Sequence, residues 1–467
     1  MKIFNEKKQN KFLDLFIGLI FFVIIGLIFY KYDIDFSMVI LTFILFVYAK
    51  FFRKIDNLPS NLDLCILGMI AIWIPLLTIT TFKISGYGIS VIGFAILITL
   101  LFENLELSFI FSVFISLLGA SIGDNNLGIG ISLLAGSITA SMLTIRIRRR
   151  FQVIKAGFFA GLILFVFAYI SERRLSSFVM SGLDLQFLRD LLSVCLINGL
   201  ISSFIVLGIL PVFEYIFKVV TNISLLELSD FNHPLLRRLI LEAPGTYQHS
   251  LVVANLSESA AEAASANSLL ARVGAYYHDV GKLVKPDYFT ENLVRFKDMH
   301  KKLKPSISKL IILNHVKEGI DLAKKHHLNP KIIDFIVQHH GKTLVYYFYH
   351  RARELEPEGE HEEDYRYPGP KPQSKETAIV ALADTIEALS RTLDEPTPAR
   401  IDEMVREVVK SRFMDGELDE SNLTMKDLEK ITQSFVRMLN AVFHTRINYP
   451  KDESRNNKQS KSKENKS

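Results

Sequence analysis

The chain has 467 residues, of which 49% are hydrophobic and 22% charged, and its net charge is +5. The length allows two or three ordinary domains. The two cysteines, Cys65 and Cys195, lie within apolar runs and have no CxxC neighbour, which excludes a disulfide framework and a thiolate metal site. Much of the positive charge comes from short loops and a Lys-rich tail, so no DNA or RNA polymer is expected as a partner.

The two halves of the chain differ in composition. Residues up to about 217 are dominated by Phe, Ile, Leu, Val and Gly, and the rest is rich in Lys, Glu, Asp and His. A helix that crosses the roughly 30 Å hydrocarbon core of a membrane needs about 20 apolar residues. We predict a transmembrane domain, 13–217, after a short N-terminal segment, 1–12. Its eight spans are 13–31, 36–52, 63–82, 86–103, 105–123, 126–144, 156–172 and 191–217.

The orientation of these spans follows from Lys and Arg, which favour the cytoplasmic side. The first span is long and lacks a small-residue cleavage site, so we interpret it as an anchor and not as a signal peptide. The lysines before it and the basic cluster 146–155 are then expected inside, and an even number of spans places the C-terminal half inside too. Arg173, Arg174 and Arg189 fall outside and count against this scheme.

Ionisable residues in the interior of a span are the usual mark of a transport pathway. The predicted spans are nearly free of them, and Glu103, Glu106 and Asp124 lie at span edges. We therefore favour anchoring and signal input over transport. The Gly-rich stretch 119–130 is expected to pack helices closely.

The C-terminal half is predicted to be a helical bundle, which makes the whole chain all-α. After a connecting segment, 218–245, the predicted domain covers 246–449. Apolar residues recur there at 3.6-like spacing in 246–265, 268–281, 305–326, 330–339, 374–392, 397–411 and 423–445. Segment 354–373, Glu-rich and then Pro-rich, is predicted to be a surface loop. The polar tail 450–467 is expected to be disordered.

Seven His and Asp residues lie within or at the ends of these apolar helices, where a polar side chain must be hydrogen-bonded or coordinate something. They are His249, His278, Asp279, His315, His339, His340 and Asp384. Imidazole and carboxylate together suit divalent ions such as Mn or Fe, and an aspartate can bridge two ions. His249 or His315 alone would be interpreted as a satisfied core residue, and the double histidine 339–340 is a somewhat stronger signal. Seven on five predicted helices favour a metal site.

The His278-Asp279 pair is the centre of this pattern. Adjacent residues on a helix point about 100° apart, and a metal centre in the core of a bundle tolerates that divergence if Asp279 bridges two ions while His278 approaches from the side. Gly281 is expected to end the helix and open the site. Lys282 would then be a cation beside the metals, suited to a phosphate oxygen.

Long local stretches carry a family resemblance. They are PGTYQHSLVVANL, LLARVGAYYHDVGKL, SKLIILNHVKEG, QHHGKTLVYYFYH, YRYPGPKPQSKE and AIVALADTIEALSR, between Pro244 and Arg391. They resemble the HD superfamily of metal-dependent phosphohydrolases, and more closely the membrane-bound 7TM-HD cyclic-di-AMP phosphodiesterases of the PgpH type. The resemblance extends over nearly the whole chain.

The resemblance implies two metal ions. One would be held by His249, His278, Asp279 and Asp384, and the other by His315, His339 and His340 with Asp279 shared. Metal-activated water would attack phosphorus, with Asp279 and Lys282 as catalytic residues, and open cyclic di-AMP to linear 5′-pApA.

The resemblance also implies a multi-pass protein of the bacterial inner membrane with a cytoplasmic HD domain, and it allows a homo-oligomer. One departure concerns the external part of the protein. Family members usually carry a large extracellular sensor domain between the first two spans, where this chain has only the short segment 30–36.

Two alternatives stay open at this point. Cyclic-di-GMP phosphodiesterases of the HD-GYP kind have a similar core but carry Gly-Tyr-Pro soon after the double histidine. Here His340 is followed by GKTLVYYFYH. A non-catalytic receptor would use the same bundle only to bind a cyclic dinucleotide, and it predicts eroded ligands, which the sequence does not show.

Overall fold

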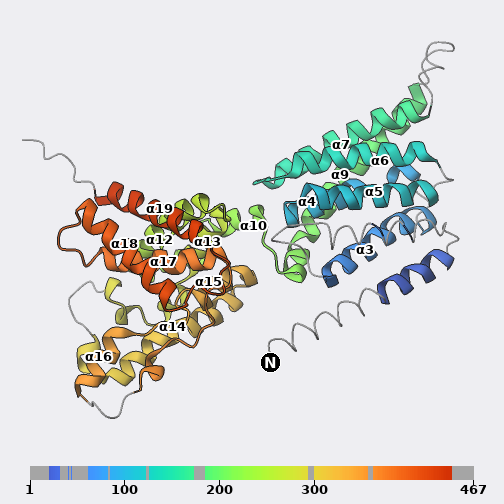
Figure 1. The fold of residues 1–467 in the computed structure, drawn as a ribbon. Coiled ribbons are helices and arrows are strands. Elements are labelled where there is room, and N and C mark those ends of the chain that lie inside the picture. The colour runs from blue at the N-terminus through green and yellow to red at the C-terminus, as the bar shows by residue number, and fades with distance from the viewer. Residues whose placement is uncertain are drawn as a thin grey trace, which may run out of the picture. The chain divides into compact units, whose positions relative to one another are not determined.

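The computed structural model describes residues 20–31, 40, 44, 61–81, 85–122, 126–172, 185–292, 299–355 and 361–443. In this part of the chain the regular elements are helices, and Leu344 and Arg366 form an isolated antiparallel bridge. The all-α prediction is confirmed. The chain divides into two compact units, Met1–His233 with His327–Lys331, and Pro234–His326 with Ile332–Ser467 (Figure 1). The first boundary lies inside the connecting segment 218–245.

The first unit holds the apolar helices. Five in the described part are long and apolar enough to cross a membrane: Asp63–Thr81, Leu105–Ile122 (α5), Leu127–Thr144 (α6), Arg150–Ser171 (α7) and Leu185–Phe217 (α9). The first of these combines α3 (Asn61–Leu76) with a π-helical turn, Leu77–Thr81. Two shorter apolar helices are Ile20–Lys31 and Gly86–Phe102, which includes α4 (Val91–Phe102). The predicted span 36–52 lies almost wholly outside the described residues, so the count of eight stays a prediction.

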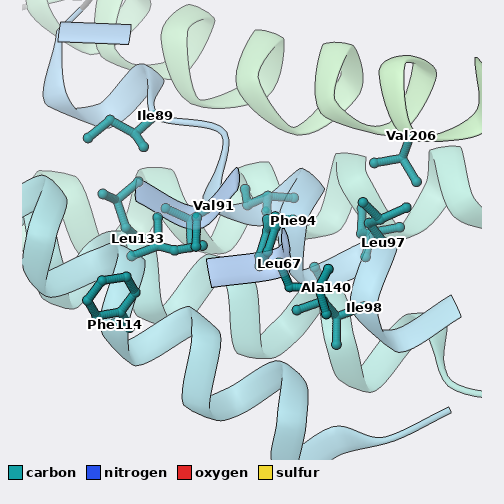
Figure 2. Close-up of a cluster of buried hydrophobic side chains, with 14 of the residues drawn as sticks. Leu67, Ile89, Val91, Phe94, Leu97, Ile98, Phe114, Leu133, Ala140 and Val206 are labelled. Atoms are coloured by element: carbon teal, nitrogen blue, oxygen red, sulfur yellow. The ribbon is translucent and has the colours of Figure 1, made fainter. Parts of the chain in front are cut away.

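Helix α4 lies in the middle of this unit. Every residue of Val91–Leu101 is buried, and the helix packs against α5, α6 and α9. A helix that is apolar on every face is typical of an element surrounded by other helices. Figure 2 shows Phe94 and Leu97 of α4 in one apolar cluster with Leu133 of α6 and Val206 of α9.

Glycines let neighbouring helices of this unit approach closely. A Cβ placed on Gly199 of α9 would lie 2.1 Å from the backbone oxygen of Gly157 of α7. In the predicted close-packing stretch 119–130, a Cβ on Gly130 of α6 would lie 3.1 Å from the backbone oxygen of Ser116 of α5. Small residues at such contacts are the usual basis of helix packing in membranes, where burial from water contributes little.

Short helices lead from the first unit to the second. They are α10 (Asn222–Leu228) and α11 (Pro234–Glu242). The remaining helices are α12 (Pro244–Ala263), α13 (Ser268–Tyr277), α14 (Pro305–Lys325), α15 (Pro330–Gln338), α16 (Tyr346–Leu355), α17 (Lys375–Ser390), α18 (Pro398–Met414) and α19 (Met425–Phe443).

Helix α12 is the central helix of the second unit, packed against α13, α17 and α19 (Figure 1). Its Ala260 and Phe435 of α19 are fully buried. Local signals start these helices where they do: Pro244 occupies the first turn of α12, and Ser374 and Thr377 form a capping box at α17. Apolar periodicity and capping therefore agree in this bundle.

Helix α13 ends earlier than predicted. It stops at Tyr277, and a 3-10 turn, η3 (Val280–Val284), follows. The prediction that Gly281 ends the helix is therefore wrong. A Cβ on Gly281 would lie 1.8 Å from the backbone oxygen of His315, so glycine is needed because η3 presses directly on α14.

The segment 344–373 contains more structure than predicted. Helix α16 forms where no helix is predicted, and it buries only Phe348 and Ala352, too few apolar positions for a clear periodic signal. Within the predicted surface loop 354–373, residues 356–360 lie outside the described part, but Tyr365 is fully buried in a 3-10 turn, η7 (Glu362–Tyr365). The later part of this segment is therefore packed into the unit.

Candidate metal centre

The structure brings the seven predicted ligands together from five helices or their ends. His249 lies in α12, His315 in α14 and Asp384 in α17. The two adjacent pairs lie past helix ends, His278-Asp279 after α13 and His339-His340 after α15. Each pair therefore contributes two neighbouring ligands from the end of one helix.

The seven side chains form two groups that share one carboxylate. The first is His249, His278, Asp279 and Asp384, and the second is Asp279, His315, His339 and His340. Within each group the candidate ligand atoms lie within 4.8 Å of one another. Asp279 and His278 are 1% and 0% exposed, so the centre is inside the bundle.

Backbone carbonyl oxygens orient three imidazole rings through hydrogen bonds at Nδ1, the ring nitrogen that faces away from the centre. The Nδ1 atoms of His278, His315 and His339 lie 2.7, 2.5 and 3.0 Å from carbonyl oxygens three or four residues earlier in the chain. A carbonyl oxygen only accepts, so each Nδ1 carries the hydrogen and donates. The lone pair of the neutral ring is then on Nε2, which points to the centre, as is common among metal-binding histidines.

His249 is held in the same way by a carboxylate that was not predicted from the sequence. Its Nδ1 lies 2.6 Å from Oε2 of Glu387, and Glu387 also accepts a hydrogen bond from Nε of Arg391 at 2.6 Å. Glu387 follows Asp384 by three residues on α17, which places both on one face of the helix. That spacing is the signal that could have revealed it.

The donor set fits divalent ions. Oδ1 of Asp279 is buried and receives no hydrogen bond among the described residues, although it lies 3.5 and 3.6 Å from Nε2 of His315 and of His339. Those two Nε2 atoms are 3.4 Å apart. Converging lone pairs around an unpartnered buried carboxylate oxygen are unfavourable without a cation between them. A transition-metal ion with N and O ligands suits this chemistry.

The charges of the two groups differ. Although burial favours the neutral ring, the carboxylates of Asp279 and Asp384 raise the pKa of His278 to about 10. In the second group, burial lowers the pKa of His315 to about 4, and it holds the pKa of His340 well below its usual value. The first group thus carries a proton on His278 that a metal has to displace, whereas His315 and His340 of the second group present neutral rings.

Lys282 is paired with two carboxylates. Its Nζ lies 2.7 Å from Oδ2 of Asp279 and 2.8 Å from Oε1 of Glu291. Burial opposes ionisation of Asp279, but Lys282 and His278 outweigh it and hold the pKa of Asp279 well below its usual value. Thr246 donates to Glu291 at 3.1 Å, so the pair ties the start of α12 to the centre.

Tyr367 closes one side of the second group. Its ring stacks on His340 with centroids 4.1 Å apart and planes at 25°, and its backbone N–H donates to Thr343 at 3.0 Å. From the sequence, Tyr367 was assigned to a surface loop, and this contact was missed. A tyrosine followed by prolines is no local signal for a ring packed on a histidine 27 positions earlier.

Comparisons with known proteins agree with this architecture. Residues 34–221 match the family described as 7TM receptor with intracellular HD hydrolase, and residues 246–389 match the HD domain. Seven of the eight predicted spans lie within the first match.

Two curated relatives are similar over most of the chain. The cyclic-di-AMP phosphodiesterase PgpH of Bacillus subtilis (strain 168) is 39% identical over 373 residues, 78% of this chain and 51% of the relative. PgpH of Listeria monocytogenes serotype 1/2a (strain 10403S) is 38% identical over 363 residues, 77% of this chain and 50% of the relative. The chain spans about half the length of these relatives.

A solved structure is similar to part of this chain. The crystal structure of the L. monocytogenes PgpH HD domain in complex with cyclic di-AMP is 45% identical, covers 46% of this chain and 100% of that chain, and gives a TM-score of 0.45. The two family matches, in the order membrane region and then HD domain, bear out the resemblance noted from the sequence. The chain belongs to the 7TM-HD family of membrane proteins, in which a 7TM region is joined to an intracellular HD hydrolase domain.

Proposed function

We propose that this chain is a membrane-anchored, metal-dependent phosphodiesterase that opens cyclic di-AMP to linear 5′-pApA. The observation that carries the proposal is the pair of ligand groups that share Asp279, with the Nε2 atoms of the ring-anchored histidines turned inward. The curated relatives named as cyclic-di-AMP phosphodiesterases support the choice of substrate.

In this proposal, His249, His278 and Asp384 hold one ion and His315, His339 and His340 the other, with Asp279 shared. Two bound ions, Mn or Fe, would supply an activated water and neutralise charge at the phosphate. The protein residues keep the ligand rings in a single orientation, exclude bulk water by burial, and place the Lys282 ammonium next to Asp279. In this proposal the Lys282 ammonium would offset negative charge that develops on a phosphoryl oxygen as the ribose 3′-oxygen leaves.

The proposed location is the bacterial inner membrane, with the HD domain in the cytoplasm. One span before the 7TM region gives an even number of crossings, which places the N-terminal lysines and the HD domain on the same side. This arrangement agrees with the preference of Lys and Arg for the cytoplasmic side.

A turnover assay with both dinucleotides tests the proposal. The full chain, purified in detergent and loaded with Mn²⁺, is expected to convert cyclic di-AMP to 5′-pApA faster than it cleaves cyclic di-GMP. The double variant His278→Ala with Asp279→Ala is expected to be inactive, and the exposed Asp287→Asn serves as a control with normal activity. Faster cleavage of cyclic di-GMP would reverse the substrate assignment, and equal inertness of wild type and variant would favour a receptor.

A further inference from the structure

A cavity of about 250 Å³ opens beside the second ligand group. His315 and Gly281 form part of its wall, and Phe289, Asn314 and Glu318 are among its other lining residues. Pockets for drug-sized ligands measure about 300–1,000 Å³. This cavity therefore suits one nucleobase, held next to the proposed metal centre, better than a whole dinucleotide.

The cavity is rimmed by exposed apolar side chains. Leu310, Ile307 and Val284 line it and are 61%, 45% and 44% exposed. Exposed apolar side chains grouped around a hollow are typical of ligand-binding surfaces. Phe289 adds an aromatic ring whose centroid lies 5.9 Å from that of His315. A purine in the cavity would thus contact aromatic and aliphatic surface.

The side-chain amide of Asn314 in this wall has a fixed orientation. Nδ2 of Asn314 donates to Oε1 of Glu318, one turn along α14, at 2.7 Å. A carboxylate only accepts, so a flipped Asn314 amide would place Oδ1 against Oε1. Glu318 therefore fixes the Asn314 amide with Oδ1 as an acceptor beside the second N–H of Nδ2.

We propose that this cavity binds one adenine of the cyclic dinucleotide and that the Asn314–Glu318 pair selects adenine over guanine. The inference rests on the proposed function. On its Watson–Crick edge adenine presents the N6 amino donor next to the acceptor N1, and an asparagine amide, with an acceptor oxygen beside donor N–H groups, can pair with that pattern through two hydrogen bonds. On the same edge guanine has the acceptor O6 in place of the amino group and the donor N1–H in place of the acceptor N1, so O6 would face Oδ1 and N1–H would face the N–H of Nδ2. Only a flip of the Asn314 amide would remove this repulsion, and the hydrogen bond to Glu318 opposes that flip.

Paired variants test the direction of this hydrogen bond. In Glu318→Gln the new amide can donate or accept, so Asn314 becomes free to flip. A two-bond base contact discriminates by about 5- to 150-fold, and we expect a loss of this order in the ratio of kcat/KM for cyclic di-AMP to that for cyclic di-GMP. Adding Asn314→Asp reverses the polarity, because the new carboxylate accepts from the glutamine amide introduced by Glu318→Gln and from guanine N1–H and N2–H. The ratio is expected to fall further.

The control is Asp321→Asn, an exposed carboxylate on the same helix, which is expected to leave the ratio unchanged. Bound metal and unfolding temperature are measured for each variant in the full chain. If the pair only stabilises α14, Glu318→Gln lowers the unfolding temperature without changing the ratio, and the inference is overturned. If wild-type chain retains metal but cleaves neither dinucleotide, the proposed function fails and the inference fails with it.

Discussion

At the scale of single residues, the centre depends on groups that accept a hydrogen bond from Nδ1 of the ligand histidines and so fix their orientation. Backbone carbonyls anchor Nδ1 of His278, His315 and His339, and Glu387 anchors Nδ1 of His249. Such partners set the tautomer and the ring orientation before any ion binds. The carbonyls cannot be removed by mutation, but the Glu387 carboxylate can.

Substitution of Glu387 is expected to weaken metal binding. Glu387→Leu removes both the acceptor and the charge, and loss of such a partner typically lowers metal affinity by about 10–100-fold. Glu387→Gln keeps an acceptor and should lower it less. The measurement is Mn²⁺ affinity by competition with a chelating dye, with the exposed Glu403→Gln as control. Equal affinities for wild type and Glu387→Leu would contradict the assigned role.

Metal binding at the first group is expected to depend on pH. Burial disfavours the charged ring, but Asp279 and Asp384 raise the pKa of His278 to about 10, so the ring is protonated at neutral pH without metal. An ion must displace that proton, so affinity should rise about tenfold per pH unit for each proton released. In the second group, burial lowers the pKa of His315 to about 4, so this ring has no such proton to release at neutral pH. Calorimetry in two buffers measures the released protons, and metal binding without any proton release would contradict the protonated state of His278.

At the scale of elements, the centre depends on the close contact of the turn η3 with α14. Gly281 has no Cβ, and so η3 can lie against the backbone of His315 and Gly319. This contact sets the distance between Asp279, just before η3, and His315 on α14. The two ligand groups can share Asp279 only if that distance is kept.

Gly281→Ala is expected to separate these two elements. The new Cβ would lie 1.8 Å from a backbone oxygen, and overpacking of this kind costs about 1–3 kcal/mol or more. We expect a lower unfolding temperature and loss of bound metal, measured by thermal unfolding and elemental analysis. Gly208→Ala is the control, because its Cβ would meet nothing within 4 Å. Normal metal content in Gly281→Ala would contradict the importance of this contact.

The elements that could be predicted from the sequence are those with a periodic or a chemical signal. Helices such as α12 and α17 follow from apolar spacing, and the ligand residues follow from polar side chains on apolar helices. Helix α16 and Tyr367 were missed because their burial depends on partners distant in the chain, which no local pattern records. The role predicted for Gly281, to end its helix, is wrong, because the need for glycine there comes from contact with α14, which is distant in the chain.

At the scale of the whole molecule, the chain joins an apolar helical unit to a helical HD unit. Within the first unit, Arg150 and Glu227 form a two-bond ion pair, with Nε–Oε1 and Nη2–Oε2 distances of 2.6 and 2.9 Å. The pair connects the start of α7 to α10, the helix that follows the last span. The basic cluster 146–155 therefore lies beside the chain segment that leads to the HD unit, on the side predicted to be cytoplasmic.

The predicted topology can be tested by cysteine labelling in intact cells. An even number of spans places segment 173–184 outside and the C-terminal tail inside. A membrane-impermeant maleimide is therefore expected to label Ser176→Cys in intact cells, and Ser460→Cys only after permeabilisation. Both variants are made in a chain with Cys65 and Cys195 replaced by Ala. Labelling of Ser460→Cys in intact cells would contradict the orientation.

In the proposed function, two ions bound around Asp279 enable the chain to open cyclic di-AMP. The most direct measurement is the rate of 5′-pApA formation by the full chain as a function of Mn²⁺ bound per chain. We predict that the metal-free chain is inactive and that the full rate is reached when two ions are bound. A full rate without metal, or no 5′-pApA with two ions bound, would contradict the claim.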